Sequence, residues 1–175
     1  MYKMLYKTPL QFGNLFLFSD GRYLTGVCFE GFENAGSYSL CSQIVSDSSS
    51  EGCFCQTVRW LDLYFSGKVP DFVPDFKIEN VTPFRQKVLN SLMKIPFGQT
   101  VTYGSIAREI LCADGKKMSA QAVGAALGWN PIEIIIPCHR VVGASGNLTG
   151  YGGGLENKAE LLKHELFYSF GLHKL

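Results

Sequence analysis

The sequence is poor in charged residues and has no long apolar run. Asp, Glu, Lys and Arg make up 18% of the 175 residues and hydrophobic residues 46%, a balance typical of globular proteins and not of disordered chains. No run approaches the roughly 18 apolar residues that a membrane span needs. The start, MYKMLYKTPLQF, lacks the apolar core and cleavage site of a signal peptide. We therefore expect a cytoplasmic protein with no membrane partner.

Histidine and cysteine are also scarce. The chain has three histidines, none before residue 139, and six cysteines, too few for a disulfide framework of this length. Cys53 and Cys55 lie close together, but a zinc site would need a second cysteine pair or nearby histidines. We interpret these two as ordinary thiols near a loop and predict neither a metal nor an organic cofactor, while zinc in the N-terminal half is left open.

The N-terminal half reads as a hairpin followed by a helix. Two β-prone runs flank an Asp-Gly turn within residues 14–30, and the stretch SDSSSEG after them reads as a loop. Apolar residues recur at helical spacing over residues 57–68, and Gly67 is a plausible helix end. The proline-containing segment 68–83 is the best connection between domains, so we predict domains at 1–80 and 81–175.

Charge divides unevenly between these halves. Residues 1–80 hold 6 Lys+Arg against 9 Asp+Glu, a net charge of −3, and residues 81–175 hold 10 against 6, a net charge of +4. A basic excess in one half suits a polyanionic partner there, although four charges are weak evidence alone.

Three helices are predicted at the start of the second half. The first begins at Pro83 with Thr82 as N-cap, because proline fits the first helical position and threonine caps it. A second follows Thr102, and a third follows Ser119 and ends near Gly128. The polar connection between the second and third suggests a helix-turn-helix.

A cysteine and a histidine stand side by side after these helices. The isoleucines at 134–136 predict a short buried strand or extended segment that ends at Pro137, directly before Cys138 and His139. A nearby imidazole or helix terminus lowers a thiol pKa and favours the nucleophilic thiolate. Neighbours in an extended chain face opposite ways, so the imidazole must reach the sulfur through a turn or a water.

A last helix, predicted over about 155–165, offers a third group. Glu165 lies at the edge of an apolar stripe with Leu155 and Ala159, where its carboxylate could accept the other N–H of His139 and form a Cys-His-Glu relay. The alternatives stay open, because Cys138 could be a buried structural cysteine, His139 an ordinary satisfied histidine and Glu165 a solvated helix end.

Several motifs carry a family resemblance. The segments PFGQTVTYGSIA, AVGAALGWNP, IPCHRVVGASG and GYGGGLENKAELLKHE, in this order, closely resemble the methylated-DNA–protein-cysteine methyltransferases, the O6-alkylguanine-DNA alkyltransferases. The resemblance extends from about residue 84 to 165 and is looser before. It implies an N-terminal ribonuclease-H-like α/β domain and a mostly helical C-terminal domain with a winged helix-turn-helix.

The resemblance also implies the activity, which is repair of DNA by direct reversal. Cys138 would take the alkyl group from O6 of guanine, once per protein molecule, with His139 acting through a water and Glu165 orienting His139. Tyr103 would donate toward the purine ring as the guanine leaves, and Asn130 would tie the recognition helix to the active-site loop. The implied partner is double-stranded DNA, bound as a monomer through the minor groove.

Two further sets of residues follow from the resemblance. The residues expected at the DNA are Tyr103, Ser119, Ala120, Gln121, Ala122, Gly124 and Arg140. The residues expected around the alkylguanine are Pro137, Val141, Tyr151, Gly152 and Gly153. The small residues of the third helix suit close approach to a minor groove, where readout is largely independent of sequence.

The chain departs from the family pattern at two positions. Gln121 stands where the family usually has an arginine that fills the gap left by the extruded base, and Gly152 stands where many members have Ser, Ala or Arg. Three other functions were weighed: a non-catalytic lesion sensor, a cysteine hydrolase using Cys138, His139 and Glu165, and a transcription factor. Alkyl-group size, O4-alkylthymine repair and cooperative assembly on DNA are left open.

Overall fold

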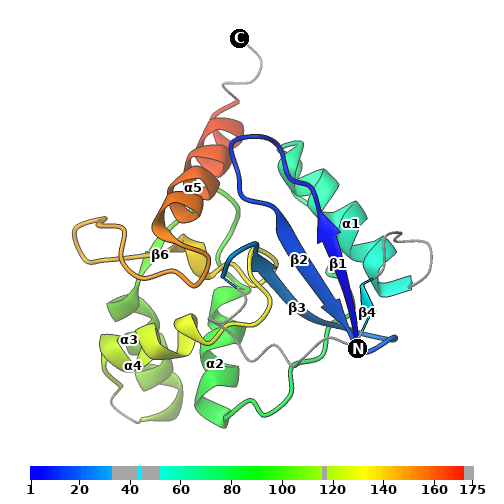
Figure 1. The fold of residues 1–175 in the computed structure, drawn as a ribbon. Helices are drawn as coiled ribbons and strands as arrows, with labels where there is room; N and C mark the ends of the chain where they lie inside the picture. Colours follow the sequence, from blue (N-terminus) through cyan, green and yellow to red (C-terminus); the bar gives the residue numbers. More distant parts are fainter. Residues whose placement is uncertain (33–42, 45–51, 116–117, 172–175) are drawn as a thin grey trace.

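The computed structural model describes residues 1–32, 43–44, 52–115 and 118–171 (Figure 1). A sheet with one helix forms the N-terminal half, and helices dominate the C-terminal half, so the expected α/β plus helical fold class is confirmed. Residues 46–51 of the loop expected at 46–52, and part of the connection expected between the second and third helices, lie outside the described residues. Among the residues described, no helix is long and apolar enough to cross a membrane.

Four strands form the N-terminal sheet in the order β3-β2-β1-β4. Strand β1 (Tyr2–Tyr6) pairs antiparallel with β2 (Leu15–Ser19), which pairs antiparallel with β3 (Leu24–Phe29). The short β4 (Gln43–Ile44) runs parallel to β1 on its other side. The predicted hairpin is therefore confirmed as β2–β3. Strand β1 was not predicted from the sequence. Met4 is its one buried residue, so the strand lacks the alternation of buried and exposed side chains that indicates a half-buried strand.

Helix α1 (Gly52–Phe65) packs against β2 and β3. The predicted helix is confirmed, and Gly67 ends it with a φ of 79°, but it starts five residues earlier than expected. Cys53 therefore lies in the first turn of the helix, and its sulfur lies 3.0 Å from Ser19 Oγ. Burial of Cys53 extends the apolar face of the helix toward the sheet.

The three predicted helices of the second half are α2 (Pro83–Leu92), α3 (Tyr103–Asp114) and α4 (Ala120–Gly128). Their expected N-caps are confirmed, since the side-chain oxygens of Thr82, Thr102 and Ser119 each accept an N–H of the first turn. Figure 1 shows α3 and α4 side by side, and these two helices contact each other as in a helix-turn-helix.

A small second sheet joins α3 to the chain after the Cys-His pair. Strand β5 (Val101–Thr102), directly before α3, pairs in parallel with β6 (Val141–Val142). A short 3₁₀ turn, η3 (Cys138–Arg140), leads into β6, and helix α5 (Leu155–Ser169) contacts η3 from the C-terminal end of the chain. Residues far apart in sequence thus meet at η3.

The isoleucine run is buried as predicted, but it is not a strand. The Ile135 N–H donates to Glu133 O at 2.8 Å, which closes a tight turn around Ile134, whose φ is 69°. A positive φ is strained for a β-branched residue, and such strain persists only where the surroundings impose it. The prediction of a strand or extended segment was wrong, because apolar content predicts burial and cannot distinguish a buried extended segment from a buried turn.

Strand β3 connects the sheet to this turn. Val27 N donates to Pro131 O at 2.8 Å, and Glu133 N donates to Val27 O at 3.0 Å, so residues 131–133 run along the edge of the sheet. One continuous apolar core includes residues from both halves. The division into domains near residue 80 stays our proposal, supported by the helix-free connection between α1 and α2.

Candidate active site

A tight turn at Pro137 and the 3₁₀ turn η3 that follows it position Cys138. Its N–H donates to Ile136 O at 2.8 Å around Pro137, whose φ of −81° and ψ of 63° define an inverse γ-turn, and η3 begins at Cys138 itself. Asn130 Nδ2 donates to Ile136 O at 2.9 Å and to Cys138 Sγ at 3.1 Å. Asn130 therefore ties the end of α4 to the turn that carries the thiol.

The thiol is buried and neutral in this structure. The Cys138 side chain is 4% exposed, and burial, followed by the nearby charge of Glu133, raises its pKa to about 12. The hydrogen bond from Asn130 and the charge of Lys158 act in the opposite direction but are smaller. The expected lowering of the thiol pKa was wrong, because loss of solvation outweighs every favourable neighbour.

His139 presents a free lone pair. Its Nε2 lies 2.8 Å from Glu165 Oε1. Burial opposes ionisation of Glu165, but its interactions with His139 and Arg140 outweigh burial and lower its pKa to about 2. An ionised carboxylate can only accept, so the proton is on Nε2 and Nδ1 carries the lone pair. Burial lowers the pKa of His139 despite Glu165, so the imidazole is neutral. Its Nδ1 has no hydrogen-bond partner among the described residues.

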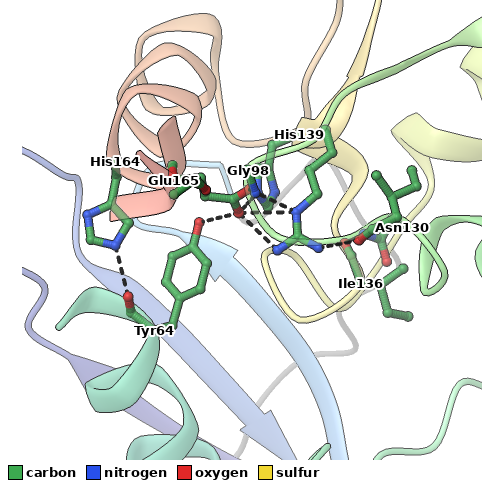
Figure 2. A network of polar contacts seen from close by, with 10 residues as sticks. Tyr64, Gly98, Asn130, Ile136, His139, His164 and Glu165 are labelled. Atoms are coloured by element: carbon green, nitrogen blue, oxygen red, sulfur yellow. Dashed lines mark hydrogen bonds and ion pairs between the residues drawn. The ribbon is translucent and has the colours of Figure 1, made fainter. Parts of the chain in front are cut away.

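Glu165 is held from several elements at once (Figure 2). Tyr64 of α1 donates its hydroxyl to Oε1 at 2.9 Å, and the Gly98 N–H donates to Oε2 at 2.8 Å. Arg140 Nε and Nη2 donate to the same carboxylate at 2.9 to 3.1 Å. Every oxygen of this buried carboxylate is therefore satisfied, which makes ionisation possible without solvent.

Arg140 lies in the interior and not at the surface. It is 9% exposed, its Nη1 donates to Ile95 O at 2.6 Å, and its other nitrogens bind Glu165. The expectation that Arg140 contacts DNA is therefore wrong. The cationic residue that does line the surface cleft described below is Arg108.

The inward face of α5 differs from the predicted one. Leu155 is 49% exposed, whereas Lys158 and His164 are buried together with Leu161 and Glu165, which were expected on or beside the inward face. Lys158 Nζ donates to Val141 O at 2.7 Å and to Thr149 O at 2.8 Å. A buried lysine thus fastens the glycine-rich loop to β6, and these carbonyls solvate its ammonium group.

A surface cleft of about 920 Å³ lies between α3, α4 and the glycine-rich loop. Six of the predicted residues line it: Tyr103, Ala120, Gln121, Gly124, Tyr151 and Gly152. Ser119 and Ala122 belong to the N-terminal end of α4 but do not line it. Tyr103 donates its hydroxyl to Thr149 O at 3.1 Å, which joins the start of α3 to the loop.

The remaining predicted pocket residues are buried and do not line the cleft: Pro137, Val141 and Gly153. Tyr151 links the two regions, because it lines the cleft and its ring meets that of His139 edge-on at 6.5 Å between centroids. Within the described residues, no three His, Cys, Asp or Glu side chains gather as a metal site would require.

Sequence reasoning missed Tyr64, Lys158 and Glu133. Tyr64 was assigned to an apolar helix face, where the need of a buried hydroxyl for a partner was a usable signal. Lys158 lies seven residues before Glu165, hence on the same helix face. Glu133 sits within the apolar run, and a carboxyl group at such a position requires an explanation.

Comparison with known proteins matches both halves of the chain. Residues 1–77 match the family model described as 6-O-methylguanine DNA methyltransferase, ribonuclease-like domain. Residues 83–167 match the model of the DNA binding domain of the same methyltransferase. A Mycobacterium leprae protein named methylated-DNA–protein-cysteine methyltransferase is 45% identical over 124 residues, 69% of this chain and 72% of that protein. A protein of the same name from Methanosarcina acetivorans is 46% identical over 116 residues, 66% of this chain and 71% of that protein.

Solved structures give the same result. The Mycobacterium tuberculosis OGT in complex with DNA superposes with a TM-score of 0.77 and 37% identity, covering 96% of this chain and 94% of that one. The O6-methylguanine-DNA methyltransferase from Pyrococcus kodakaraensis superposes with a TM-score of 0.60 and 26% identity, covering 94% and 98%. The likeness therefore includes both halves together.

Proposed function

Because the chain belongs to the O6-methylguanine DNA methyltransferase family, we propose that it repairs DNA by moving the alkyl group of O6-alkylguanine to its own Cys138. The observation that supports this assignment is the neutral Cys138 thiol next to an imidazole whose Nδ1 lone pair is available and whose Nε2–H is held by an ionised carboxylate. The imidazole can accept the thiol proton during the reaction itself, so Cys138 need not be ionised to the thiolate beforehand.

The transfer is a substitution at the alkyl carbon. The thiol proton moves to His139 Nδ1, through a water, and Glu165 stabilises the imidazolium that forms. The sulfur forms a bond to the alkyl carbon as the bond from that carbon to O6 breaks, and the electron pair goes to the guanine. Guanine then takes up a proton, with the Tyr103 hydroxyl as the proposed donor toward the ring. The product thioether is stable, so each molecule acts once.

DNA binding is assigned to the cleft and to α4. The exposed side of α4 carries Ala120, Gly124 and Ala125, which project little beyond the backbone and suit the narrow minor groove of double-stranded DNA. A base inside a duplex must leave the stack to reach a buried thiol. The thiol is buried and does not line the cleft, which agrees with extrusion of the guanine into the protein.

We further propose that the protein works as a monomer in the cytoplasm and needs no metal or organic cofactor. A reducing compartment keeps Cys138 as the free thiol that the reaction consumes. The substrate brings its own alkyl group, and His139 and Glu165 supply the proton transfer.

Intact mass spectrometry with an O6-methylguanine oligonucleotide tests the function. We expect a mass gain of one methyl group in place of one hydrogen, located on Cys138 by peptide mapping, and no gain in Cys138→Ser. Methylation of Cys53, Cys55 or Cys112, or activity of Cys138→Ser, would exclude Cys138 as acceptor. Many turnovers per protein would favour the hydrolase, and no transfer would favour the lesion sensor.

A further inference from the structure

A second buried carboxyl group, that of Glu133, lies near the thiol. Glu133 is 3% exposed and belongs to the strained turn between α4 and η3. Its backbone N–H is held by Val27 O at 3.0 Å, and its carboxyl accepts a hydrogen bond from the Phe29 backbone N–H. Strand β3 therefore fixes both the backbone and one end of the side chain.

The other carboxyl oxygen faces the glycine-rich loop. Glu133 Oε2 has no hydrogen-bond partner among the described residues, although it is fully buried. A Cβ placed on Gly153 would lie 2.7 Å from this oxygen and 2.9 Å from the Tyr151 ring, so Glu133 and Tyr151 both pack closely against Gly153. The unpartnered oxygen thus lies beneath the loop proposed to surround the alkylguanine.

The same oxygen is near the reacting atoms. The Tyr151 ring, which packs against Gly153 as Glu133 does, meets the His139 ring edge-on, and Glu133, when ionised, acts on the Cys138 thiol more strongly than any other charged group. Two buried atoms without partners among the described residues, His139 Nδ1 and Glu133 Oε2, therefore flank Tyr151. His139 Nδ1 accepts the thiol proton in the proposed reaction, whereas that reaction gives Glu133 Oε2 no role.

The protonation state defines what Glu133 can offer. Burial raises its pKa to about 8, and the Phe29 N–H only partly offsets this, so the group is a neutral carboxylic acid near pH 7. A neutral acid has one O–H donor as well as acceptor oxygens. A buried donor without a partner is unfavourable, and a bound molecule that satisfies it gains selectivity over one that does not.

We propose that Glu133 is a specificity-determining residue that favours O6-alkyl groups bearing a hydroxyl, such as 2-hydroxyethyl, over apolar groups of the same length, such as propyl. This rests on the proposed function, because the alkyl group must approach Cys138. The hydroxyl of the hydroxyethyl group completes the hydrogen bonding of Glu133, whereas a propyl group buries the carboxyl without a partner. One such hydrogen bond corresponds to about a tenfold difference in rate.

The experiment measures second-order rate constants of transfer to Cys138 from duplex oligonucleotides carrying O6-methyl-, O6-(2-hydroxyethyl)- or O6-propylguanine. We expect wild type to prefer hydroxyethyl to propyl by about tenfold. Glu133→Met, an apolar side chain of similar length, should remove most of this preference, and Glu133→Gln, whose amide can still hydrogen-bond, should keep part of it. Glu156→Met, on the exposed first turn of α5, is the matched control and should keep the wild-type ratio.

The proposal is contradicted by any of the following results. A hydroxyethyl-to-propyl ratio near one in wild type overturns it, whatever the variants do, so the test holds even if Glu133→Met fails to fold. An unchanged ratio in folded Glu133→Met also overturns it, as does an equal fall in all three rates, which would indicate a purely structural role. Methyl transfer by wild type separates the two proposals, since its absence contradicts the proposed function itself.

Discussion

Glu165 and Glu133 are both buried carboxyl groups next to the Cys138–His139 pair, yet their pKa values are shifted in opposite directions. Glu165 accepts hydrogen bonds from Tyr64, Gly98, His139 and Arg140, and its pKa is lowered to about 2. Glu133 accepts one from Phe29, and burial raises its pKa to about 8.

The difference shows that partners, and not burial, decide the charge of a buried acid. Desolvation raises the pKa of both groups, but Arg140 and His139 overcome it at Glu165 and nothing comparable among the described neighbours does so at Glu133. One group can therefore stabilise a cation that forms on His139, while the other can donate a hydrogen bond near pH 7. Carboxyl pairs with divided roles are familiar in enzyme active sites.

Removing the charge of Glu165 should have the largest effect. In Glu165→Gln, Arg140 loses its buried counter-charge, so the free energy of unfolding should fall by about 3 to 5 kcal/mol. Methyl transfer near neutral pH should also slow, because the imidazolium on His139 loses its stabilising partner. Urea unfolding and single-turnover rates measure both effects.

Glu156→Gln, at an exposed position of the same helix, is the control and should change neither quantity. Wild-type stability and an unchanged pH dependence of the rate in Glu165→Gln would show that Glu165 is an ordinary helix carboxylate.

The pH dependence of stability should separate the two carboxyls. The folded state holds a proton on Glu133 up to about pH 8, whereas an unperturbed glutamate loses it near 4.5, so stability should fall between these values as pH rises. The loss should be about 4 to 5 kcal/mol, because each unit of pKa difference corresponds to about 1.4 kcal/mol. Glu165 acts oppositely, since its stabilisation is lost as pH falls from 4.5 toward 2.

Thermal unfolding across this range checks the prediction. In Glu133→Gln the decline between pH 4.5 and 8 should flatten while the acid-side loss stays. An identical slope in the variant would mean that Glu133 ionises normally in the folded protein.

The N-terminal half contributes to the Glu165 site through one hydroxyl. Tyr64→Phe keeps the ring packing but removes the hydrogen bond to Glu165, so stability should fall by about 1.5 to 3 kcal/mol, with a smaller change in transfer rate than in Glu165→Gln. Tyr6→Phe removes a comparable bond to the exposed Asp62 and should cost less. Equal effects of the two substitutions would argue against a buried, charge-assisted bond at Tyr64.

The smallest effect is expected at Gln121, which lines the cleft and lies outside both carboxyl sites. An arginine there is longer and charged, and it should stabilise the extruded base by about one charge-assisted hydrogen bond, on the order of 1 to 2 kcal/mol. Gln121→Arg should therefore speed repair of duplex O6-methylguanine roughly tenfold. Reaction with free O6-benzylguanine, if the pocket admits it, should stay unchanged. Equal acceleration of both substrates would contradict a role in base extrusion.

Local pattern in the sequence was enough to predict much of the fold. Apolar spacing and capping residues predicted α1 to α5 and the β2–β3 hairpin, because helices and hairpins are stabilised by neighbours within a few positions. The order of the motifs around Cys138 was enough to identify the family, because each motif is a contiguous run of residues.

The tertiary structure decided which groups meet and what charge they carry. Tyr64 and Glu165 are 101 residues apart, and Arg140 pairs with Glu165 in the interior although the sequence suggested a surface position. The thiol pKa was predicted with the wrong sign, and Glu133 was not noticed at all. The sequence determined the elements and indicated the proposed nucleophile through local interactions. Desolvation and long-range pairing, which set protonation and side-chain direction, depend on the assembled fold.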